Sequence, residues 1–446
     1  MTKQAHILVF GAGKSATVLI DFLKKTITQN NWLLTVADSN LATVLAKLDG
    51  HPGSTGLQIN IEDQDARKSL VQSASIVISM MPPSLHYLIA EDCLEFGVNL
   101  LTASYLDEKT KALSQEIEEK GLLFLYEMGL DPGIDHMSAM QIIHEIQSKG
   151  GVINSFRSHC GGLVAPENDD NPWHYKISWN PRNVVLAGSA GARYLEQGEE
   201  VAMPYHGLFN NEETLDIPGL YPLGFYPNRD SLSYIPIYGL ESANSFVRTT
   251  LRYPEFLKGW AGILHLGLTD QSHIYQFDQL SIAAFFKLHI ERLALTNWLD
   301  SLVEQSSHEA MAAHFLEQLN WLGLHDQDTL LPMTQGTAAD VLQFLLETKL
   351  ALLPGEKDMI VMQHEFDYQI GTETHSLKSS LVCIGEDDQH TAMAKTVGLP
   401  LGIAAKLIVE NQIQLKGLHI PILPQIYEPV LAALKAEGIE FQETQS

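Results

Sequence analysis

Three small residues near the start of the sequence have the spacing that a dinucleotide-binding turn requires. Gly11, Gly13 and Ala16 form a G-x-G-x-x-A pattern between an apolar run at 5–10 and residues with helical spacing. The first glycine allows a tight turn, the second leaves room for a pyrophosphate, and the small third residue lets helix and strand pack closely. The helix N-terminus then presents free N–H groups to the phosphates. We expect the whole turn to contact the cofactor: Gly11, Ala12, Gly13, Lys14, Ser15 and Ala16.

The same turn has two other interpretations. The end of a P-loop is spelled by Gly13-Lys14-Ser15, but a P-loop needs a glycine five residues before Gly13, where this chain has Leu8. An ordinary connection between a strand and a helix is the second alternative, and these three residues alone leave it open.

An acidic residue ends the second predicted strand. Asp38 closes the run at 33–38 and follows Ala16 by 22 residues, where a carboxylate accepts hydrogen bonds from the adenosine ribose hydroxyls. A carboxylate there repels the 2′-phosphate of NADP, and the neighbours Ser39 and Asn40 supply no cation. The sequence therefore predicts NAD in preference to NADP, with Asp38 and Ser39 contacting the cofactor. A helix N-cap is the alternative role for Asp38.

The charge balance limits the possible partners. The 446 residues contain 28 Lys and Arg against 54 Asp and Glu, a formal net charge of -26. Nucleic acids and anionic membranes are bound by clustered cations, so we expect neither as a partner. A small anionic ligand would have to be bound by a few locally placed cations, and each arginine within a motif becomes informative.

Alternating strands and helices must position these residues. Short apolar runs of the kind found in buried strands are separated by helical stretches over the first 130 residues. This alternation predicts an α/β fold with a Rossmann-type, doubly wound parallel sheet. The predicted strands lie at 5–10, 33–38, 75–81, 98–104 and 122–129.

Three domains are predicted from the change in texture along the chain. The dinucleotide-binding domain covers 1–130 and is completed by 393–446. A mixed α/β domain for substrate binding and dimerisation covers 131–254 and 353–392, with a hairpin at 358–370 and 375–385. The inserted segment 255–352 is predicted to be helical, because stretches such as 281–305 and 312–324 carry apolar residues at helical spacing.

The cysteines and the N-terminus indicate a reducing compartment. Cys93, Cys160 and Cys383 are widely spaced, so no disulfide framework or zinc site is expected, and no histidine pair has the spacing of a metal site. The short apolar run at the N-terminus is unlike a signal peptide, and no uninterrupted apolar stretch reaches the length of a membrane span. We expect a cytoplasmic protein without a metal.

Longer motifs resemble one enzyme family over nearly the whole chain. From Ser104 onward the sequence resembles the saccharopine reductases, which are the glutamate-forming saccharopine dehydrogenases. The block CGGLVAPENDDNPWHYKISW at 160–179 is far more specific than a dinucleotide motif. Further support comes from ASYL at 103–106, GLDPGIDHM at 129–137, YPNRDS at 226–231, TLRYPEF at 250–256 and, more weakly, 394–417.

The resemblance implies the reaction. Saccharopine, a secondary amine that joins lysine and glutamate skeletons, would lose a hydride to the nicotinamide. Water would then split the imine into glutamate and 2-aminoadipate semialdehyde. The resemblance also implies lysine metabolism and a homodimer, while the physiological direction stays open.

The resemblance assigns substrate roles to residues within the motifs. Because the substrate carries three carboxylates, Arg229 and Arg252 are expected to bind them, with Thr250 and Leu251 beside Arg252. Ion pairing within the protein is the alternative for both arginines. By the same resemblance, the substrate pocket is completed by Ser104, Tyr105 and Asp131.

The remaining assignments concern the cofactor and proton transfer. Asp131, Tyr105 and Cys160 are the ionisable candidates for catalysis, although Cys160 could simply be a packed residue and Asp131 a turn residue before proline. Trp179 is expected beside the nicotinamide, with core packing as its alternative. The resemblance also places these residues at the cofactor: Ser104, Leu130, Asp131, Pro132 and Trp179.

One departure and two rivals qualify this interpretation. NADP-using members of the family have a sequence similar to Cys-Arg-Thr where this chain has Ala37, Asp38 and Ser39. This difference puts in doubt whether the present chain shares their use of NADP. A carboxynorspermidine dehydrogenase would act on a polyamine with fewer carboxylates, and the presence of both Arg229 and Arg252 speaks against it. A nucleotide-sensing protein without turnover is the other rival, and Asp131 with the arginines argues for catalysis.

Overall fold

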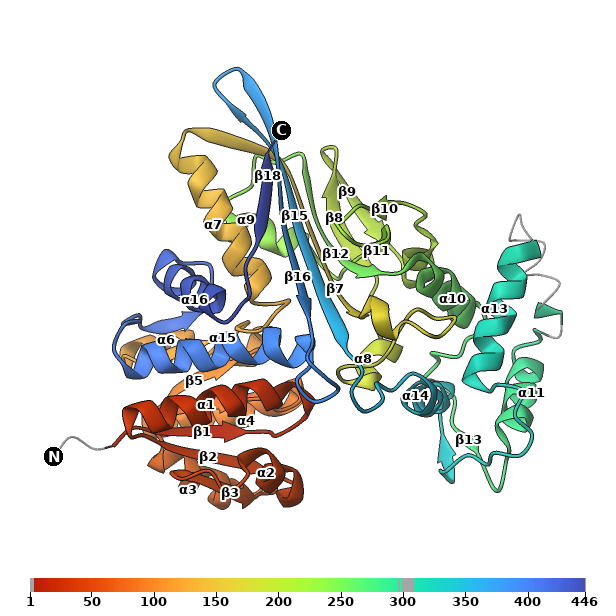
Figure 1. Cartoon of the computed structure of the whole chain (residues 1–446), viewed down its shortest axis with the longest axis horizontal. Helices are drawn as coiled ribbons and strands as arrows, with labels where there is room; N and C mark the ends of the chain where they lie inside the picture. Colours follow the sequence, from red (N-terminus) through yellow and green to blue (C-terminus); the bar gives the residue numbers. More distant parts are fainter. Residues whose placement is uncertain (1–3, 296, 299–308, 446) are drawn as a thin grey trace. The chain divides into compact units, whose positions relative to one another are not determined.

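The computed structural model describes residues 4–295, 297–298 and 309–445, which fold into two compact units (Figure 1). Unit 1 contains 1–153, 368–375 and 381–446, and unit 2 contains 154–367 and 376–380. The predicted cofactor-binding residues belong to unit 1, except for Trp179, which belongs to unit 2. The arginine motifs predicted to bind the substrate belong to unit 2.

Unit 1 is built around a seven-stranded sheet in the order β17-β6-β5-β4-β1-β2-β3, in which each pair of neighbours is parallel. The apolar runs form its strands because a parallel sheet is buried on both faces. The strands are β1 (His6–Phe10), β2 (Leu33–Asp38), β3 (Ser54–Gln58), β4 (Ile76–Ser79), β5 (Asn99–Thr102), β6 (Leu123–Leu125) and β17 (Gly417–His419).

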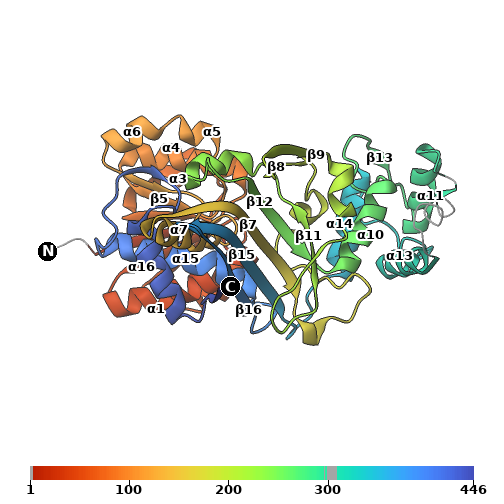
Figure 2. The ribbon, with the colours of Figure 1, turned by 90° about the horizontal axis from the view of Figure 1, so that it is seen from above.

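Helices cover both faces of this sheet. Figure 2 shows α3, α4 and α6 on one face and α1 with α15 on the other. The order of the strands reverses between β1 and β4, and such a point opens a ligand crevice at the carboxyl edge of the sheet. The predicted doubly wound fold is confirmed. The helices are α1 (Thr17–Asn30), α2 (Leu41–Leu48), α3 (Gln64–Ser73), α4 (His86–Phe96), α5 (Glu108–Lys111), α6 (Ser114–Glu119), α7 (Ile134–Ser148), α15 (Ala392–Val409) and α16 (Pro424–Ala436).

The long apolar helix α15 is a core element of unit 1. A Cβ atom at Gly398 would lie 2.9 Å from the backbone nitrogen of Leu19 in α1, and one at Gly402 would lie 2.7 Å from the ring of Phe22. The two glycines, one turn apart, therefore let α15 approach α1 closely. By length and composition α15 is also apolar enough to cross a membrane, but 72% of its 18 residues are buried inside the protein. A core helix explains both its composition and its burial.

Unit 2 holds most of a second, mixed sheet in the order β10-β11-β12-β7-β15-β16-β18, with β8 paired to β12 and to β9. Strand β12 runs parallel to β7 and antiparallel to β11. The predicted hairpin is present as β15 (Asp358–Ile370) and β16 (Glu373–Ile384). The other strands are β7 (Gly151–Val164), β8 (Ala192–Glu196), β9 (Glu199–Met203), β10 (Thr214–Leu215), β11 (Leu223–Pro227), β12 (Ser245–Arg252) and β18 (Gln442–Gln445), with the short pair β13 (Tyr275–Gln276) and β14 (Gln335–Gly336).

The helical segment of unit 2 shares a hydrophobic core with the segment that precedes it. Buried side chains between Trp173 and Tyr226 pack together with those of the helices up to Leu350. The chain therefore groups into two units, and 255–352 does not separate as a third. Of the predicted helical stretch 281–305, the structure shows α11 up to Arg292 and then a turn in which Ala294 has φ +53°, while 296 and 299–305 lie outside the described residues. The helices are α8 (Pro181–Val185), α9 (Ile235–Tyr238), α10 (Pro254–His265), α11 (Ile282–Arg292), α13 (Glu309–Leu322) and α14 (Ala338–Lys349).

Candidate functional site

The predicted glycine turn lies between β1 and α1. Gly11 has φ +100°, and a Cβ atom there would lie 2.9 Å from the carbonyl oxygen of Met80, so only glycine fits. Gly13 is exposed, and apart from Gly13 itself and its two chain neighbours no atom of the described residues lies within 4 Å of the position that its Cβ would occupy. Ala16 is buried and donates its N–H to the carbonyl of Gly13 at 3.0 Å. The turn therefore leaves open space at its second glycine, as a pyrophosphate requires.

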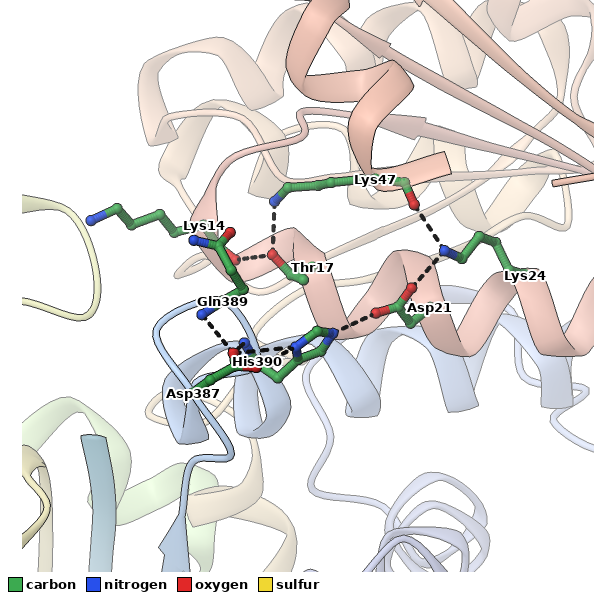
Figure 3. A network of polar contacts seen from close by, with 8 residues as sticks. All are labelled: Lys14, Thr17, Asp21, Lys24, Lys47, Asp387, Gln389 and His390. Atoms are coloured by element: carbon green, nitrogen blue, oxygen red, sulfur yellow. Dashed lines mark hydrogen bonds and ion pairs between the residues drawn. The ribbon is translucent and has the colours of Figure 1, made fainter. Parts of the chain in front are cut away.

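A lysine from α2 holds this turn from the side. Lys47 Nζ donates to the carbonyl of Gly13 at 2.6 Å and to the hydroxyl of Thr17 at 2.8 Å (Figure 3). Burial lowers the pKa of Lys47 to about 8, although Asp21 and Asp38 favour its charged form. The side chain of the predicted residue Lys14 is exposed and points away from this network. Sequence reasoning missed Lys47, since it lies 34 residues beyond the turn.

The network around Lys47 continues into the loop before α15. Lys24 donates to the carbonyl of Lys47 at 2.8 Å and pairs with Asp21 at 2.7 Å. His390 Nε2 lies 3.1 Å from Asp21, and its backbone N–H donates to Asp387 at 2.6 Å (Figure 3). Burial lowers the pKa of His390, but the hydrogen bonds to Asp387 and Asp21 outweigh it and raise the pKa above its usual value. Three segments that are distant in sequence thus support the base of the glycine turn.

The carboxylate of Asp38 faces the glycine turn. Its Oδ2 accepts from the N–H of Ala12 at 2.7 Å, and its Oδ1 accepts from the N–H of Asn40 at 2.9 Å and the hydroxyl of Ser39 at 3.2 Å. Asn40, and not Asp38, is the N-cap of α2, because its side chain accepts from the N–H of Thr43. Over the described residues, no Lys or Arg nitrogen lies within 4 Å of the Asp38 carboxylate. The side chain is anchored by these hydrogen bonds and has no direct ion pair among the described residues.

Two loops at the carboxyl ends of β5 and β6 bring the predicted catalytic residues of unit 1 together. Tyr105 follows β5, Asp131 follows β6, and the Tyr105 hydroxyl donates to Asp131 Oδ1 at 3.4 Å. Both side chains are partly exposed. Leu130 and Pro132 beside Asp131 are buried, so a ligand would meet their backbone atoms.

A buried glutamate missed by the sequence analysis ties the two loops together. Glu127 has φ +58°, accepts from the N–H of Leu106 at 3.1 Å and lies 2.8 Å from His136 Nε2. The N–H of Glu127 also donates to the carbonyl of Ser104 at 3.1 Å. Gly133 has φ +148°, and a Cβ atom there would overlap the backbone of Gly129. These contacts fix the backbone that carries Asp131.

A buried histidine lies behind the predicted residue Ser104. His86, at the start of α4, is 2% exposed, and its Nε2 lies 2.7 Å from the Ser104 hydroxyl. Its Nδ1 lies 2.7 Å from the hydroxyl of Ser79, the last residue of β4. Burial lowers the pKa of His86 to about 4, although Asp107 opposes this shift. The sequence did offer a clue to His86, because this histidine lies seven residues after Ser79, close to the carboxyl end of the strand predicted at 75–81.

Arg252 of unit 2 is a buried cation without a carboxylate partner among the described residues. It is 4% exposed, and its guanidinium carbon lies 5.2 Å from the ring centre of Tyr175 and 5.5 Å from that of Phe256. Its Nη1 donates to the carbonyl of Leu251 at 2.7 Å, while its buried Nε has no hydrogen-bond partner in the described part of the chain. A buried guanidinium held by aromatic rings and lacking a counter-ion suits an incoming carboxylate.

The other predicted substrate residues differ in burial and in the face of the sheet on which they lie. Thr250 lies on the same face of β12 as Arg252, whereas Leu251 is fully buried in the core on the opposite face and offers a ligand only backbone atoms. Arg229 is exposed, with φ +52°. Gly224 of β11 pairs with Arg252, and β11 ends at Pro227, so Arg229 lies in the loop that follows this strand.

Three further residues of unit 2 have a defined setting. Cys160 is 6% exposed and pairs in register with Thr250. Trp179 is partly buried and packs against the hydrophobic core of unit 2. Arg248, missed by the sequence analysis, is 3% exposed, shares the Arg252 face of β12 and lies 4.6 Å from the ring centre of Tyr234. The roles of Cys160 at the reacting carbon and of Trp179 at the nicotinamide stay predictions.

Comparison with known proteins decides the family. Residues 7–125 match the saccharopine dehydrogenase NADP binding domain, and 129–439 match the saccharopine dehydrogenase C-terminal domain. The chain belongs to the saccharopine dehydrogenase family. The resemblance predicted from the motifs is thereby confirmed.

Individual relatives place the chain within the saccharopine dehydrogenases. The mitochondrial alpha-aminoadipic semialdehyde synthase of Mus musculus is 36% identical over 100% of this chain, which spans 48% of that protein. The chain thus spans about half the length of the first curated relatives. The saccharopine dehydrogenase [NADP(+), L-glutamate-forming] of Saccharomyces cerevisiae is 32% identical, with 98% of both chains covered.

Solved structures agree with this family fold. The apo histidine-tagged saccharopine dehydrogenase (L-Glu forming) from Saccharomyces cerevisiae has a TM-score of 0.90 at 30% identity and covers 99% of this chain and 100% of its own. A homospermidine synthase from Legionella pneumophila in complex with NAD has a TM-score of 0.56 at 10% identity, and shares the fold alone.

Proposed function

We propose that the protein catalyses the reversible oxidation of saccharopine. Saccharopine, NAD(P)⁺ and water give L-glutamate, 2-aminoadipate semialdehyde, NAD(P)H and a proton. The observation that carries the proposal is the buried Arg252, which lies beside the rings of Tyr175 and Phe256 and lacks a carboxylate partner among the described residues. Retaining an unpaired buried cation costs stability, and binding a substrate carboxylate would offset that cost. The names of the relatives that cover the whole chain support the same substrate.

The residues of unit 1 fit a nicotinamide dinucleotide. The open space at Gly13 and the turn fixed by Gly11 would hold the pyrophosphate, and Asp38 would accept from the adenosine ribose hydroxyls. The bound dinucleotide supplies the acceptor for the substrate hydride. Lys47 would act indirectly, since its hydrogen bonds to Gly13 and Thr17 fix the shape of the turn.

Tyr105 and Asp131 are the pair that we propose for proton handling. The partly exposed Asp131 carboxylate is an acceptor for the proton of the substrate amine and for a proton of the water that attacks the imine. The Tyr105 hydroxyl, 3.4 Å from Asp131 Oδ1, orients this carboxylate. Glu127 and Gly133 hold the backbone of both loops, so the pair does not have to be ordered when the substrate binds.

For the cofactor we propose NAD in preference to NADP. The Saccharomyces cerevisiae relative and the family domain carry NADP in their names, whereas the acidic residue at the end of β2 in this chain favours NAD. The Asp38 carboxylate accepts from three donors that fix its position, and within 4 Å it has no Lys or Arg nitrogen among the described residues. A 2′-phosphate beside it would be repelled.

One assay tests the reaction and separates its rivals. Purified protein is mixed with saccharopine and either NAD or NADP, absorbance at 340 nm is followed, and glutamate is quantified as product. We expect reduction of the dinucleotide with an equal amount of glutamate. Oxidation of carboxynorspermidine but not saccharopine would identify the polyamine enzyme, and tight NADH binding without turnover of either compound would identify a nucleotide sensor. Both outcomes would overturn the proposed function.

A further inference from the structure

A chain of three side chains runs behind the carboxyl edge of the unit 1 sheet, next to the glycine turn. Ser79, His86 and Ser104 are joined by two contacts of 2.7 Å. Met80, which follows Ser79, is the residue whose carbonyl lies against Gly11. Ser104 is partly exposed at the open end, whereas Ser79 is 1% exposed at the closed end. The chain therefore leads from the interior to the candidate site.

The burial of Ser79 fixes the direction of its hydrogen bond. His86 Nδ1 is the hydrogen-bond partner that the described residues offer to the Ser79 hydroxyl, and water has no access to it. A buried hydroxyl hydrogen without an acceptor costs about 1–3 kcal/mol. The Ser79 hydroxyl therefore donates to Nδ1. Thr102 Oγ1, at 3.5 Å from the same nitrogen, is too distant to compete.

The direction of this first hydrogen bond determines the direction of the second one, between His86 and Ser104. Because burial lowers the pKa of His86 to about 4, its ring is neutral near pH 7 and carries one N–H. With Nδ1 accepting, that hydrogen must be on Nε2, and Nε2 donates to the Ser104 oxygen. The Ser104 hydroxyl hydrogen is then directed away from His86, towards the open side of the loop.

We infer that His86 is a positioning residue that sets the Ser104 hydroxyl as a hydrogen-bond donor to an oxygen of the bound ligands. The acceptor is either the carboxamide oxygen of the nicotinamide or a carboxylate oxygen of the substrate. The inference rests on the proposed function only for the identity of these ligands. His86 does not touch them, and it acts through Ser104 alone.

Nitrogen NMR of the histidine side chains tests the direction of the chain. Protein labelled with ¹⁵N-histidine is compared with His86→Gln to assign the signals of His86. We expect the proton on Nε2 and an unprotonated Nδ1 at pH 7. The opposite tautomer, or a doubly protonated ring at pH 7, would overturn the inference. This measurement uses the intact wild-type protein and needs no turnover.

Binding measurements test the consequence. Ser104→Ala should weaken one ligand about fivefold, the worth of one net hydrogen bond of about 1 kcal/mol. His86→Leu should cause part of this loss of affinity, and the double variant should lose no more affinity than Ser104→Ala alone. His86→Gln should bind the ligand nearly as tightly as the wild type, since the glutamine amide can still donate to Ser104. Ser54→Ala, at the amino end of β3, is the matched control and should change nothing.

Two readouts distinguish the acceptors. A weaker NADH dissociation constant from fluorescence titration identifies the carboxamide oxygen, and a raised saccharopine KM at unchanged NADH affinity identifies the carboxylate. Additive losses in the double variant, or lower melting temperatures without any change in either constant, would show that His86 is merely structural. Absence of saccharopine turnover in the wild type would refute the proposed function but leave the NMR and NADH results to decide this inference.

Discussion

Replacing Asp38 by asparagine tests the cofactor preference with the smallest change in shape. The asparagine oxygen can still accept from the N–H of Ala12, at the contact that now measures 2.7 Å, but its amide nitrogen cannot accept from the N–H of Asn40, so the charge and one local hydrogen bond are lost. We expect Asp38→Asn to bind NADPH much more tightly than the wild type does. NADH binding should weaken modestly, because neutral acceptors bind ribose hydroxyls less strongly than a carboxylate.

The magnitude follows from Coulomb's law. A phosphate with a charge of about -2 placed ~6 Å from the carboxylate is repelled by about 1.4 kcal/mol at the permittivity of water and by about 5.5 kcal/mol at an effective permittivity of ~20. Since 1.4 kcal/mol is a factor of ten, the ratio of NADPH to NADH affinity should rise at least about tenfold at low salt. At 0.15 M salt the Debye length is only about 8 Å, so the difference should shrink as salt is added.

Fluorescence titration with NADH and NADPH at two salt concentrations measures these ratios. Asp49→Asn is the control, because it removes one exposed carboxylate at the C-terminus of α2, where the left-handed conformation (φ +48°) suits asparagine. It should leave the ratio unchanged. The reasoning is refuted if the wild type binds NADPH more tightly than NADH, or if Asp38→Asn and Asp49→Asn give the same ratio.

Three further predictions address the substrate, the loop and the pH dependence. Arg252→Gln should raise the saccharopine KM about 10- to 100-fold, because a charged hydrogen bond is worth about 1.5–3 kcal/mol, with an unchanged NADH dissociation constant; normal saccharopine kinetics would contradict the assignment. Gly133→Ala should lower the melting temperature far more than Gly50→Ala, since both have positive φ but only Gly133 lacks space for a Cβ; equal losses would contradict this. The pKa of His86 falls from 6.5 to about 4 on folding, so the unfolded chain binds its proton first and stability is lost as pH falls from about 6.5 towards 4. Urea unfolding at pH 7.5 and pH 5 should show about 2 kcal/mol more loss in the wild type than in His86→Gln, and parallel losses would refute the shift.

The sequence could predict the parts of the site that depend on local patterns. Gly11 and Ala16 predict the turn, because close packing between a strand and the next helix requires small residues at this spacing. Asp38 could be found by its place at the end of the next strand. The parallel sheet followed from apolar runs of strand length, since a sheet buried on both faces needs them.

Residues that act through distant contacts could not be found in this way. Lys47 reaches Gly13 from a helix face that has no local signature, and Glu127 lies in a left-handed conformation that its residue type does not suggest. The surroundings of each buried side chain could not be predicted from the sequence either. Leu251 and Arg252 are neighbours in one motif, yet the Leu251 side chain packs in a hydrophobic core, whereas Arg252 has a nitrogen without a hydrogen-bond partner among the described residues. The segment 255–352 carried no sign that its helices share a core with residues before them.

The close approach of α15 to α1 has a consequence for how the chain is synthesised and folds. The surface of α1 around Leu19 and Phe22 is covered by Gly398 and Gly402, which leave the ribosome nearly 380 residues later. Until then the nascent dinucleotide-binding segment lacks both this cover and the edge strand β17, so an apolar face stays open to water. We therefore expect that residues 7–125, although they match a family domain of their own, do not fold autonomously. Expression of that segment alone should yield aggregates. Co-expression of 381–446 as a separate chain should restore soluble protein.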